Sequence, residues 1–471
     1  MSITIKDIKA EFKKAESTLD FCWMTLTNMH AMLNRSTSLN PAHITNLILF
    51  QEQLATSIFR LQSIREKIIL EEKRLISNKK QYKIEWFVKR LQLLSKFKEG
   101  IDKIVNISKS FGDAYAYFFY QSDIELLSDH YSHKRVVNNC AGIGERGELE
   151  FIKNIKHLDG DFTIFHGITN ILRHGDFSFV DLGTMRITQI GELKTKKVSD
   201  NNFTLTLTVI KRLAKANQTQ VLPINDNDLK ETKKGRQLLG ILNLLNPTLP
   251  ENSKRATLVN PHYGKDIQEL INETKIGTIK TKQVSSGLAF SCIKLNKATL
   301  FHRIIYKKIT RPNEMQNQIV KVALNLVKKN SLDNGIILGQ LLYRDDYTDN
   351  NTPGTVPLFW HPINKKLLRS LYFGECIVMS IFNPAHLIAE LEEMGYIIDS
   401  RYATRKTTVN EKAKKTLKRF DLFISSIINF LMAESYVINA VKEIEKTPLT
   451  HPQTEIAIRI QQHFDLYDFA S

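Results

Sequence analysis

The sequence predicts an α/β core, a mixed sheet flanked by helices, with an N-terminal helical region and a C-terminal mixed α+β region. Two observations lead to this fold class. Apolar residues in 1 to about 110 recur at three- and four-residue steps, which is the period of amphipathic helices. Between about 162 and 211 the chain instead alternates apolar and polar residues over short segments separated by glycine-containing turns, as strands do.

Three domains fit a chain of 471 residues. We expect a helical arm or bundle over 1–110, the α/β core over 111–245 and the mixed α+β domain over 246–471. In the arm, Asn40-Pro41 separates the first long helix from the second, because proline disfavours helix in the residue before it and fits a helix start. A third helix is predicted from about residue 82 to 109. Such helices would contact a second copy or a partner protein, clamp a substrate, or cap the next domain.

The α/β core begins with an aromatic run over 112–120, which we interpret as a buried helix. A glycine-marked break over 142–147 leads into a short amphipathic helix that ends near His157. Strands are then predicted over 162–166, 177–181, 185–194 and 202–211.

Weaker patterns follow the core. The expected helices are near 228–245, 313–329, 384–394 and 411–446, and the expected strands are near 300–307 and 335–343. Residues 376–382 are interpreted as a buried strand that leads into a helix, and no chemistry is expected there.

The charge balance favours a polyanionic partner. Lysine and arginine number 66 against 49 aspartates and glutamates, a formal net charge of +17. Basic side chains that meet phosphates release condensed counterions, so this surplus favours nucleic acid, although an anionic membrane surface attracts the same charge. A solvated lysine-rich surface without such a partner is the plainer interpretation.

Four cysteines, at 22, 140, 292 and 376, lie far apart with no CxxC pair. This spacing argues against a disulfide framework or a structural zinc site and suits a reducing compartment. The N-terminus is charged, unlike a signal peptide, and the longest apolar stretch, 423–440, contains several polar residues. We therefore expect a cytoplasmic protein with no membrane segment. The sequence has no Walker-type phosphate loop, so no ATPase motor is expected.

The segment 173–194 predicts a β-hairpin, in which two alternating strands are joined by a turn at Leu182-Gly183-Thr184. Asp176 opens the first strand. Phe177 and Phe179 would point together from that strand into the core.

The second strand of the hairpin carries the residues suited to chemistry. Glu192 and Lys194 are two residues apart, so both leave one face while Leu193 points to the other. Asp176 and Glu192 can hold a divalent cation through carboxylate oxygens, with the backbone carbonyl of Leu193 as a further ligand. Such a cation polarises a phosphoryl oxygen and activates a water, and Lys194 would orient that water and stabilise the transition state. Phosphodiester hydrolysis needs this arrangement.

The tripeptide Glu-x-Lys is weak evidence by itself. It recurs at 11–13, 71–73, 231–233 and 273–275, in helical or loop-like contexts. Glu192 differs because it ends a strand that follows an aspartate-led strand, and this context carries the prediction.

With Asp176, Glu192 and Lys194 in this order, the segment resembles the PD-(D/E)xK superfamily, the fold of type II restriction endonucleases and archaeal Holliday-junction resolvases. The resemblance covers about residues 144–197. It implies a restriction-endonuclease-like core and a Mg²⁺-dependent endonuclease, with Mn²⁺ able to substitute. It also favours DNA as the substrate, while RNA stays open.

Members of this superfamily begin with a helix that bears a glutamate, often written G-x-x-x-E, and Gly144 to Glu148 match it. By this likeness Glu148 would face the metal and join the catalytic residues. Gly175, rather than proline, precedes Asp176, a variation that the superfamily tolerates. The stretch 165–176 also looks like bacterial nuclease-related proteins. Many multidomain members act in antiphage defence, so an effector role is expected by analogy of fold.

Three of these assignments have alternatives. Asp181 could stand in place of Asp176, Glu145 in place of Glu148, and Glu192 and Lys194 could be a solvated cross-strand pair. His166 and His174 would contact phosphate, act as acid or base, or be structural. Lys196 and Lys197 would extend the positive face toward the substrate or be merely solvated.

Two other classes of function compete with a nuclease. In one, the chain binds nucleic acid or a partner on the same fold without cutting, although an intact acidic pair with its lysine argues against this. In the other, the chain is a scaffold built on the helical arm and the motif is coincidence. A scaffold predicts no metal binding at Asp176 and Glu192.

Overall fold

The computed structural model describes residues 3–34, 40–123, 126–127, 130, 143–198, 203–212, 241, 245, 262–295, 312–329, 335–341, 357–361, 363–400, 415–418, 420–446 and 455–457. The chain divides into two compact units, Met1–Glu251 and Asn252–Ser471. The candidate site lies in the first.

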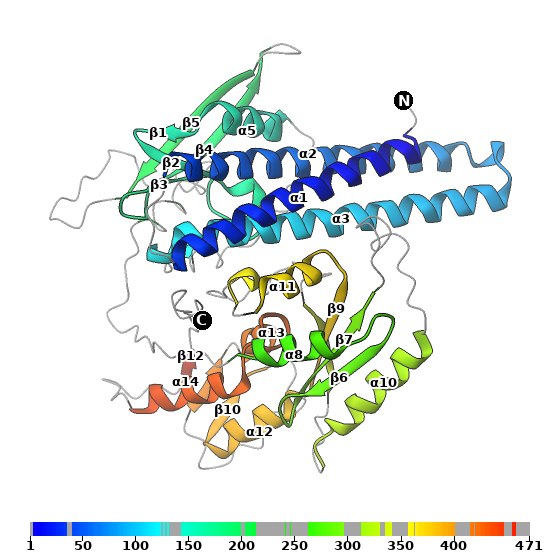
Figure 1. Cartoon of the computed structure of the whole chain (residues 1–471), viewed down its shortest axis with the longest axis vertical. Helices are drawn as coiled ribbons and strands as arrows, with labels where there is room; N and C mark the ends of the chain where they lie inside the picture. Colours follow the sequence, from blue (N-terminus) through cyan, green and yellow to red (C-terminus); the bar gives the residue numbers. More distant parts are fainter. Residues whose placement is uncertain are drawn as a thin grey trace. The chain divides into compact units, whose positions relative to one another are not determined.

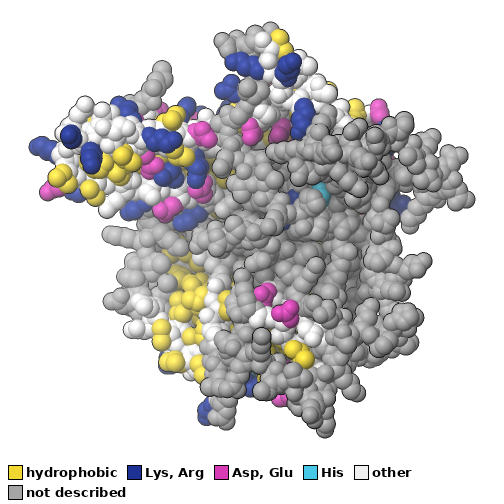
Figure 2. Space-filling model, turned by 180° about the vertical axis from the view of Figure 1, so that it is seen from behind, with side chains coloured by type: hydrophobic (Ala, Val, Ile, Leu, Met, Phe, Trp, Pro, Cys, Tyr) yellow, Lys and Arg dark blue, Asp and Glu magenta, His cyan; other side chains and the backbone are white. Residues whose placement is uncertain are grey.

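Three long helices form an arm in the first unit: α1 (Ile5–Asn34), α2 (Pro41–Ser77) and α3 (Ile84–Tyr120) (Figure 1). Helix α2 begins where the sequence predicts. Asn40 caps it by accepting a hydrogen bond from the His43 N–H, and proline occupies its first position. At the far end of the arm, basic and hydrophobic side chains interleave on the surface (Figure 2).

Helix α3 is longer than predicted, because it continues through the aromatic run instead of ending near Lys109. Gly112 does not end the helix. It allows a close approach, since a Cβ there would lie 1.9 Å from the carbonyl oxygen of Ile168. The aromatic run is therefore a buried helix, as predicted, and it brings the end of the arm onto the sheet.

The sheet of the first unit has five strands in sequential order: β1 (His157–Leu158), β2 (Asp161–Phe165), β3 (Phe177–Asp181), β4 (Arg186–Lys197) and β5 (Phe203–Lys211). All the pairs are antiparallel. The described strands therefore do not form the mixed sheet that we expected. The physical reason is the length of the connections: turns such as 182–185 reverse the chain at once, whereas a parallel pair needs a crossover of a dozen or more residues.

Helices cover both faces of this sheet. On one face, the Phe151 ring of α5 (Ile143–Asn154) lies 4.4 Å from the Phe177 ring, centroid to centroid. On the other face, Phe119 of α3 stacks on Phe162 with centroids 5.4 Å apart. Helix α2 adds Gln51, whose buried amide donates to the Thr163 carbonyl and accepts from the Phe165 N–H. This amide provides hydrogen-bond partners for backbone groups of β2 that the short strand β1 does not reach.

The second unit contains a four-stranded antiparallel sheet of order β6-β7-β9-β8 and a small parallel sheet of order β10-β11-β12. Its strands are β6 (Ile279–Gln283), β7 (Leu288–Lys294), β8 (Ile337–Gln340), β9 (Cys376–Phe382), β10 (Tyr396–Ile398), β11 (Lys415–Lys418) and β12 (Glu455–Ala457). Its helices are α8 (Gly264–Glu273), α10 (Pro312–Asn325), α11 (Lys365–Tyr372), α12 (Ala385–Glu393), α13 (Phe420–Phe430) and α14 (Glu434–Lys446).

Several predictions for the second unit can be compared with these elements, and α10 and β8 overlap the helix predicted over 313–329 and the strand predicted over 335–343. Strand β9 leads into α12, as predicted. The single helix predicted near 411–446 is wrong, because that range holds β11, α13 and α14, and Leu431 separates the two helices with a φ of 57°. The predicted strand at 300–307 and nearly all of the predicted helix near 228–245 lie outside the described residues.

The described cysteines, Cys22, Cys292 and Cys376, are free and buried. Cys140 lies outside the described residues. Within the described part of the chain, no helix combines the length and the apolar character needed to cross a bilayer.

Candidate active site

The candidate site lies at the open end of the β3–β4 hairpin, away from its turn. The hairpin is the one that the sequence predicts, and Phe177 of β3 pairs with Gly191 of β4. Asp176 comes just before β3, and its N–H donates to the Gly191 carbonyl at 2.8 Å. This hydrogen bond extends the ladder by one position, so Asp176 lies beside Glu192.

A backbone hydrogen bond fixes the carboxylate of Asp176. Its Oδ2 accepts the N–H of Leu193 at 2.7 Å. The N–H and carbonyl of one strand residue leave the strand on the same side, so the Leu193 carbonyl faces this edge as well. The sequence-predicted ligands Asp176 and Leu193 are therefore brought together.

Glu192 and Lys194 lie on one face of β4, as the two-residue period predicts. The Lys194 ammonium donates to Glu192 Oε1 at 2.5 Å. The Glu192 side chain is 6% exposed, whereas that of Lys194 is 47% exposed. The acid is thus buried, and the ammonium lies at the rim, where it can reach a solvent-borne substrate.

Glu148 of α5 completes the group of acids. Burial is the main cause that raises its pKa to about 8, and the negative charges of Asp176, Glu145 and Glu192 raise it further. Lys109 of α3 opposes this rise. The charges of the hairpin acids therefore act on Glu148.

The pKa of Asp176 is also raised, to about 7. Burial is the largest cause and the charge of Glu192 the next, while the Leu193 N–H and the Lys194 ammonium act in the opposite direction. Burial and neighbouring negative charge thus both disfavour the ionised form of Asp176, and these effects outweigh the nearby Lys194. A bound cation would offset this negative charge.

The donor set fits a hard divalent cation. Within the described residues, no three or more His, Cys, Asp or Glu side chains form a ready-made metal cage. Two carboxylates and a backbone carbonyl are all-oxygen donors that leave the remaining positions to water, and Mg²⁺ keeps several of its waters. Zinc, in contrast, favours nitrogen and sulfur donors.

Helix α5 approaches the sheet through Gly147. A Cβ at this position would lie 1.9 Å from Thr195 Oγ1 of β4, so any larger residue would push the helix away. Gly144, the glycine of the G-x-x-x-E match, has open space around it, since a Cβ there would meet nothing within 4 Å. Packing therefore requires Gly147 rather than Gly144 to hold Glu148 near the hairpin.

The structure explains why glycine, not proline, precedes Asp176. Gly175 has a φ of 69°, whereas the proline ring locks φ near −65°. Space is also short, because a Cβ would lie 2.7 Å from Ile190 Cγ2 and 2.8 Å from the Gly191 carbonyl oxygen. The turn into Asp176 therefore depends on glycine.

A chain of buried hydrogen bonds lies behind this turn and begins at His130. The His130 Nδ1 accepts the backbone N–H groups of Arg173 and His174, each at 3.2 Å. Its proton is therefore on Nε2, which lies 3.3 Å from the Tyr120 hydroxyl and donates to it.

The chain continues through Ser178 to the turn. The Tyr120 hydroxyl donates to Ser178 Oγ, and Ser178 donates to His166 Nε2, both at 2.6 Å. The His166 Nδ1 then donates to the Gly175 carbonyl at 3.0 Å. Burial lowers the pKa of His166 to about 4, so the ring is neutral as this order requires. His166 thus supports the Gly175-Asp176 turn from inside the fold.

The structure separates several alternatives that the sequence leaves open. Asp181 accepts hydrogen bonds from the Gly183 N–H and the Thr184 hydroxyl, which hold its pKa low. It lies at the turn end of β3, roughly 13 Å along the strand from Phe177. His174 is 6% exposed and buried like His166.

The remaining candidates lie nearer the rim. Lys196 and Lys197 are exposed beyond Lys194 on β4, and Glu145 lies one helical turn before Glu148 on α5.

Sequence reasoning missed four residues around the site: Lys109, Tyr120, His130 and Ser178. Lys109 lies in the middle of a long helix and carries no local signal. Tyr120 and Ser178 belong to an aromatic run and a strand, whose patterns indicate burial but not hydrogen-bond partners. Helix and strand packing brings them together.

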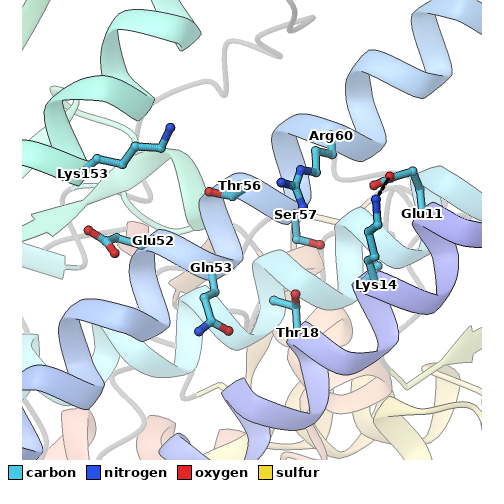
Figure 3. A pocket seen from close by; sticks show the side chains of 10 residues that line it. Glu11, Lys14, Thr18, Glu52, Gln53, Thr56, Ser57, Arg60 and Lys153 are labelled. Carbon is cyan, nitrogen blue, oxygen red and sulfur yellow. Dashed lines mark hydrogen bonds and ion pairs between the residues drawn. The ribbon is translucent and has the colours of Figure 1, made fainter.

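A groove separate from this site lies between α1, α2 and α5 and has a volume of about 560 Å³ (Figure 3). Its lining is polar: Glu11, Lys14, Ala15, Thr18, Glu52, Gln53, Thr56, Ser57, Arg60 and Lys153. Lys14 pairs with Glu11 at 2.6 Å, and Lys153 pairs with Glu150 at 3.0 Å. None of the sequence-predicted site residues lines the groove, so it is not the candidate site.

No protein-family model, curated protein or solved structure matches the chain.

Proposed function

We propose that this chain is a Mg²⁺-dependent endonuclease that hydrolyses phosphodiester bonds in DNA. One observation carries the proposal: Asp176 and Glu192 lie side by side at the end of a hairpin, with Lys194 bound to Glu192 at 2.5 Å. The raised pKa of Asp176 supports a cation at this point, because burial and the charge of Glu192 both disfavour its ionised carboxylate unless a cation offsets that charge. The resemblance to PD-(D/E)xK nucleases supports the same conclusion.

Each residue of the site would have a separate role in the hydrolysis. The carboxylates of Asp176 and Glu192 and the Leu193 carbonyl would hold Mg²⁺, with Mn²⁺ able to replace it. The bound cation would polarise a phosphoryl oxygen and offset charge in the transition state. Lys194, 47% exposed, can turn from Glu192 toward a phosphate, where it would orient the attacking water. Glu148, with a pKa of about 8, can exchange a proton near neutral pH.

Nucleic acid is the substrate class that the charge favours. The net charge of +17 suits a polyanion, and the superfamily that the motif resembles mostly cuts DNA. An effector function in antiphage defence, in the cytoplasm, is a further part of the proposal and depends on the resemblance.

The proposal is tested by incubating the purified full-length chain with plasmid DNA, linear DNA and RNA. Each substrate is incubated with Mg²⁺, with Mn²⁺ and with EDTA. We expect the chain to cut DNA with either metal and not in EDTA. If the chain cuts only RNA, the proposed site is kept and the proposed substrate becomes RNA instead of DNA. Metal binding without cutting of any substrate would instead favour a protein that binds nucleic acid or a partner on this fold.

A further inference from the structure

The far end of the arm exposes apolar side chains that nothing described in the first unit covers. We call residues 67–90 the arm tip; it comprises the end of α2, the connection and the start of α3. Its exposed large hydrophobic residues, with their exposed fractions, are Leu70 63%, Ile76 55%, Ile84 80%, Trp86 48% and Val88 44%. The Tyr82 and Trp86 rings adjoin each other there, with centroids 4.9 Å apart.

The arm tip also carries uncompensated positive charge. Its exposed lysines have no ion-pair partner among the described residues: Lys73, Lys79, Lys80, Lys83 and Lys89. Two of its acids are already engaged, because Glu71 binds Arg74 and Glu72 binds Lys98. Glu85 is the remaining acid of the tip. Basic side chains with hydrophobic ones between them are visible on this end of the arm (Figure 2).

We propose that the arm tip is a second contact surface for nucleic acid, which binds the same molecule that the candidate site cuts. This inference rests on the proposed function and adds a substrate-binding surface to it. Lysine ammonium groups neutralise phosphates and release counterions, whatever the base sequence. The adjoining rings of Tyr82 and Trp86 offer flat faces to an unpaired base.

Charge and geometry favour nucleic acid over other occupants. A second copy would bring two strongly basic tips together, which repel each other. A flat membrane surface could cover the exposed apolar residues only if they all lay on one side of the arm. Ile84 and Val88 are four residues apart and share a side of α3, but Trp86 is two residues from each, which places it on the opposite side.

The length of the arm sets a condition on the substrate. Lys109 marks where α3 passes the site, since its charge acts on Glu148, and Ile84 marks the tip. At about 1.5 Å per residue, α3 separates them by roughly 37 Å. A duplex rises about 3.4 Å per base pair, so about 11 base pairs are needed to reach from site to tip. Shorter duplexes can occupy the site but cannot reach the tip.

The experiment measures binding rather than cutting, so its result does not depend on whether the chain cuts DNA. A triple variant Lys79→Ala, Lys80→Ala, Lys83→Ala and a single variant Trp86→Ala are prepared in the full chain that also carries Glu192→Gln. The matched control removes the same charge elsewhere through Lys13→Ala, Lys275→Ala and Lys366→Ala. Fluorescent duplexes of 30 and 8 base pairs are titrated at several salt concentrations, and vesicles with anionic headgroups are tested in parallel.

We expect the triple variant to bind the 30-base-pair duplex at least about tenfold more weakly, with a salt slope smaller by about three. Its affinity for the 8-base-pair duplex and that of the control variant for both duplexes should stay the same as for the parent. Equal loss with tip and control variants, or no loss with the tip variant, would overturn the inference. Vesicle binding that depends on the tip, without an effect on DNA, would overturn it in favour of a membrane surface.

Discussion

The Leu193 N–H donates to Asp176 Oδ2 at 2.7 Å, and this hydrogen bond joins the two halves of the candidate site. It holds the first acid, which precedes β3, against the strand that carries Glu192. It also opposes the burial that raises the Asp176 pKa. Backbone geometry thus fixes Asp176 beside Leu193.

Removing the charge of Asp176 should stabilise the chain when no metal is present. Folding raises the pKa of Asp176 from 3.8 to about 7, so the folded chain holds a proton that the unfolded chain releases. The stability that this proton contributes is complete below about pH 4 and is lost as pH rises through 7. Asp176→Asn keeps an acceptor for the Leu193 N–H and removes this dependence. In EDTA, its melting temperature should exceed that of the parent by several degrees at pH 8 and match it near pH 4.

The same melting experiment with Mg²⁺ provides the second half of the test. Parent protein should be stabilised at pH 8, where Asp176 is ionised, and Asp176→Asn should not be. A melting-temperature difference that is the same at pH 4 and pH 8 in EDTA would contradict the account. Glu150→Gln, an exposed position on α5, is the control for a surface charge change.

Replacing either of two glycines of α5 with alanine should change the stability of the chain in opposite directions. Gly144→Ala meets nothing within 4 Å and should stabilise the chain by up to about 1 kcal/mol, because alanine favours helix. Gly147→Ala would collide with Thr195 and should destabilise it by about 1–3 kcal/mol while displacing Glu148. Urea unfolding measures both. Equal effects of the two substitutions would mean that α5 does not pack on β4 as described.

The turn before Asp176 should not tolerate alanine. Gly175→Ala combines a φ of 69° with contacts of 2.7 and 2.8 Å, and we expect a loss of about 2–4 kcal/mol. Gly160→Ala is the matched control, since its φ is 91° but nothing lies within 4 Å of its Cβ position, and it should lose about 1–2 kcal/mol. If Gly175→Ala proves no more harmful than Gly160→Ala in chemical unfolding, the close approach to Ile190 is not real.

The buried hydrogen-bond chain behind the turn should depend on Ser178. Ser178→Ala leaves the Tyr120 hydroxyl and the His166 Nε2 without their shared partner, which costs about 1–3 kcal/mol of stability. Ser77→Ala, on an exposed part of α2, should change stability by less than about 0.5 kcal/mol. Equal stabilities of these two variants in urea would show that the chain of hydrogen bonds does not form.

The hairpin and the placement of its polar residues could be predicted because their signals are local. Alternation and a glycine turn indicate β3 and β4, and a two-residue step places Glu192 and Lys194 on one face. The pairing of Asp176 with Leu193 follows once the two strands form a ladder. Such short-range rules need no knowledge of the rest of the fold.

What the sequence does not predict depends on packing between distant segments. Nothing local marks Lys109 as a neighbour of Glu148, since one lies on α3 and the other on α5. The periodicity of α5 does not say that Gly147, rather than Gly144, meets β4. The direction of the strands is likewise not encoded locally. Apolar alternation predicts a strand but not the antiparallel pairing that all described strands of this sheet share.

Single-turnover cleavage tests most directly whether Asp176, Glu192 and Lys194 cut DNA with a bound cation. The rate of plasmid nicking with Mg²⁺ is compared for the parent, Glu192→Gln, Lys194→Met and Lys196→Met. Lys196 is the matched control, because it is exposed on the same face of β4, two residues beyond Lys194. We predict that the first two substitutions lower the rate at least about a hundredfold and that Lys196→Met leaves it within about threefold. Cleavage that persists in Glu192→Gln and Lys194→Met would contradict the account.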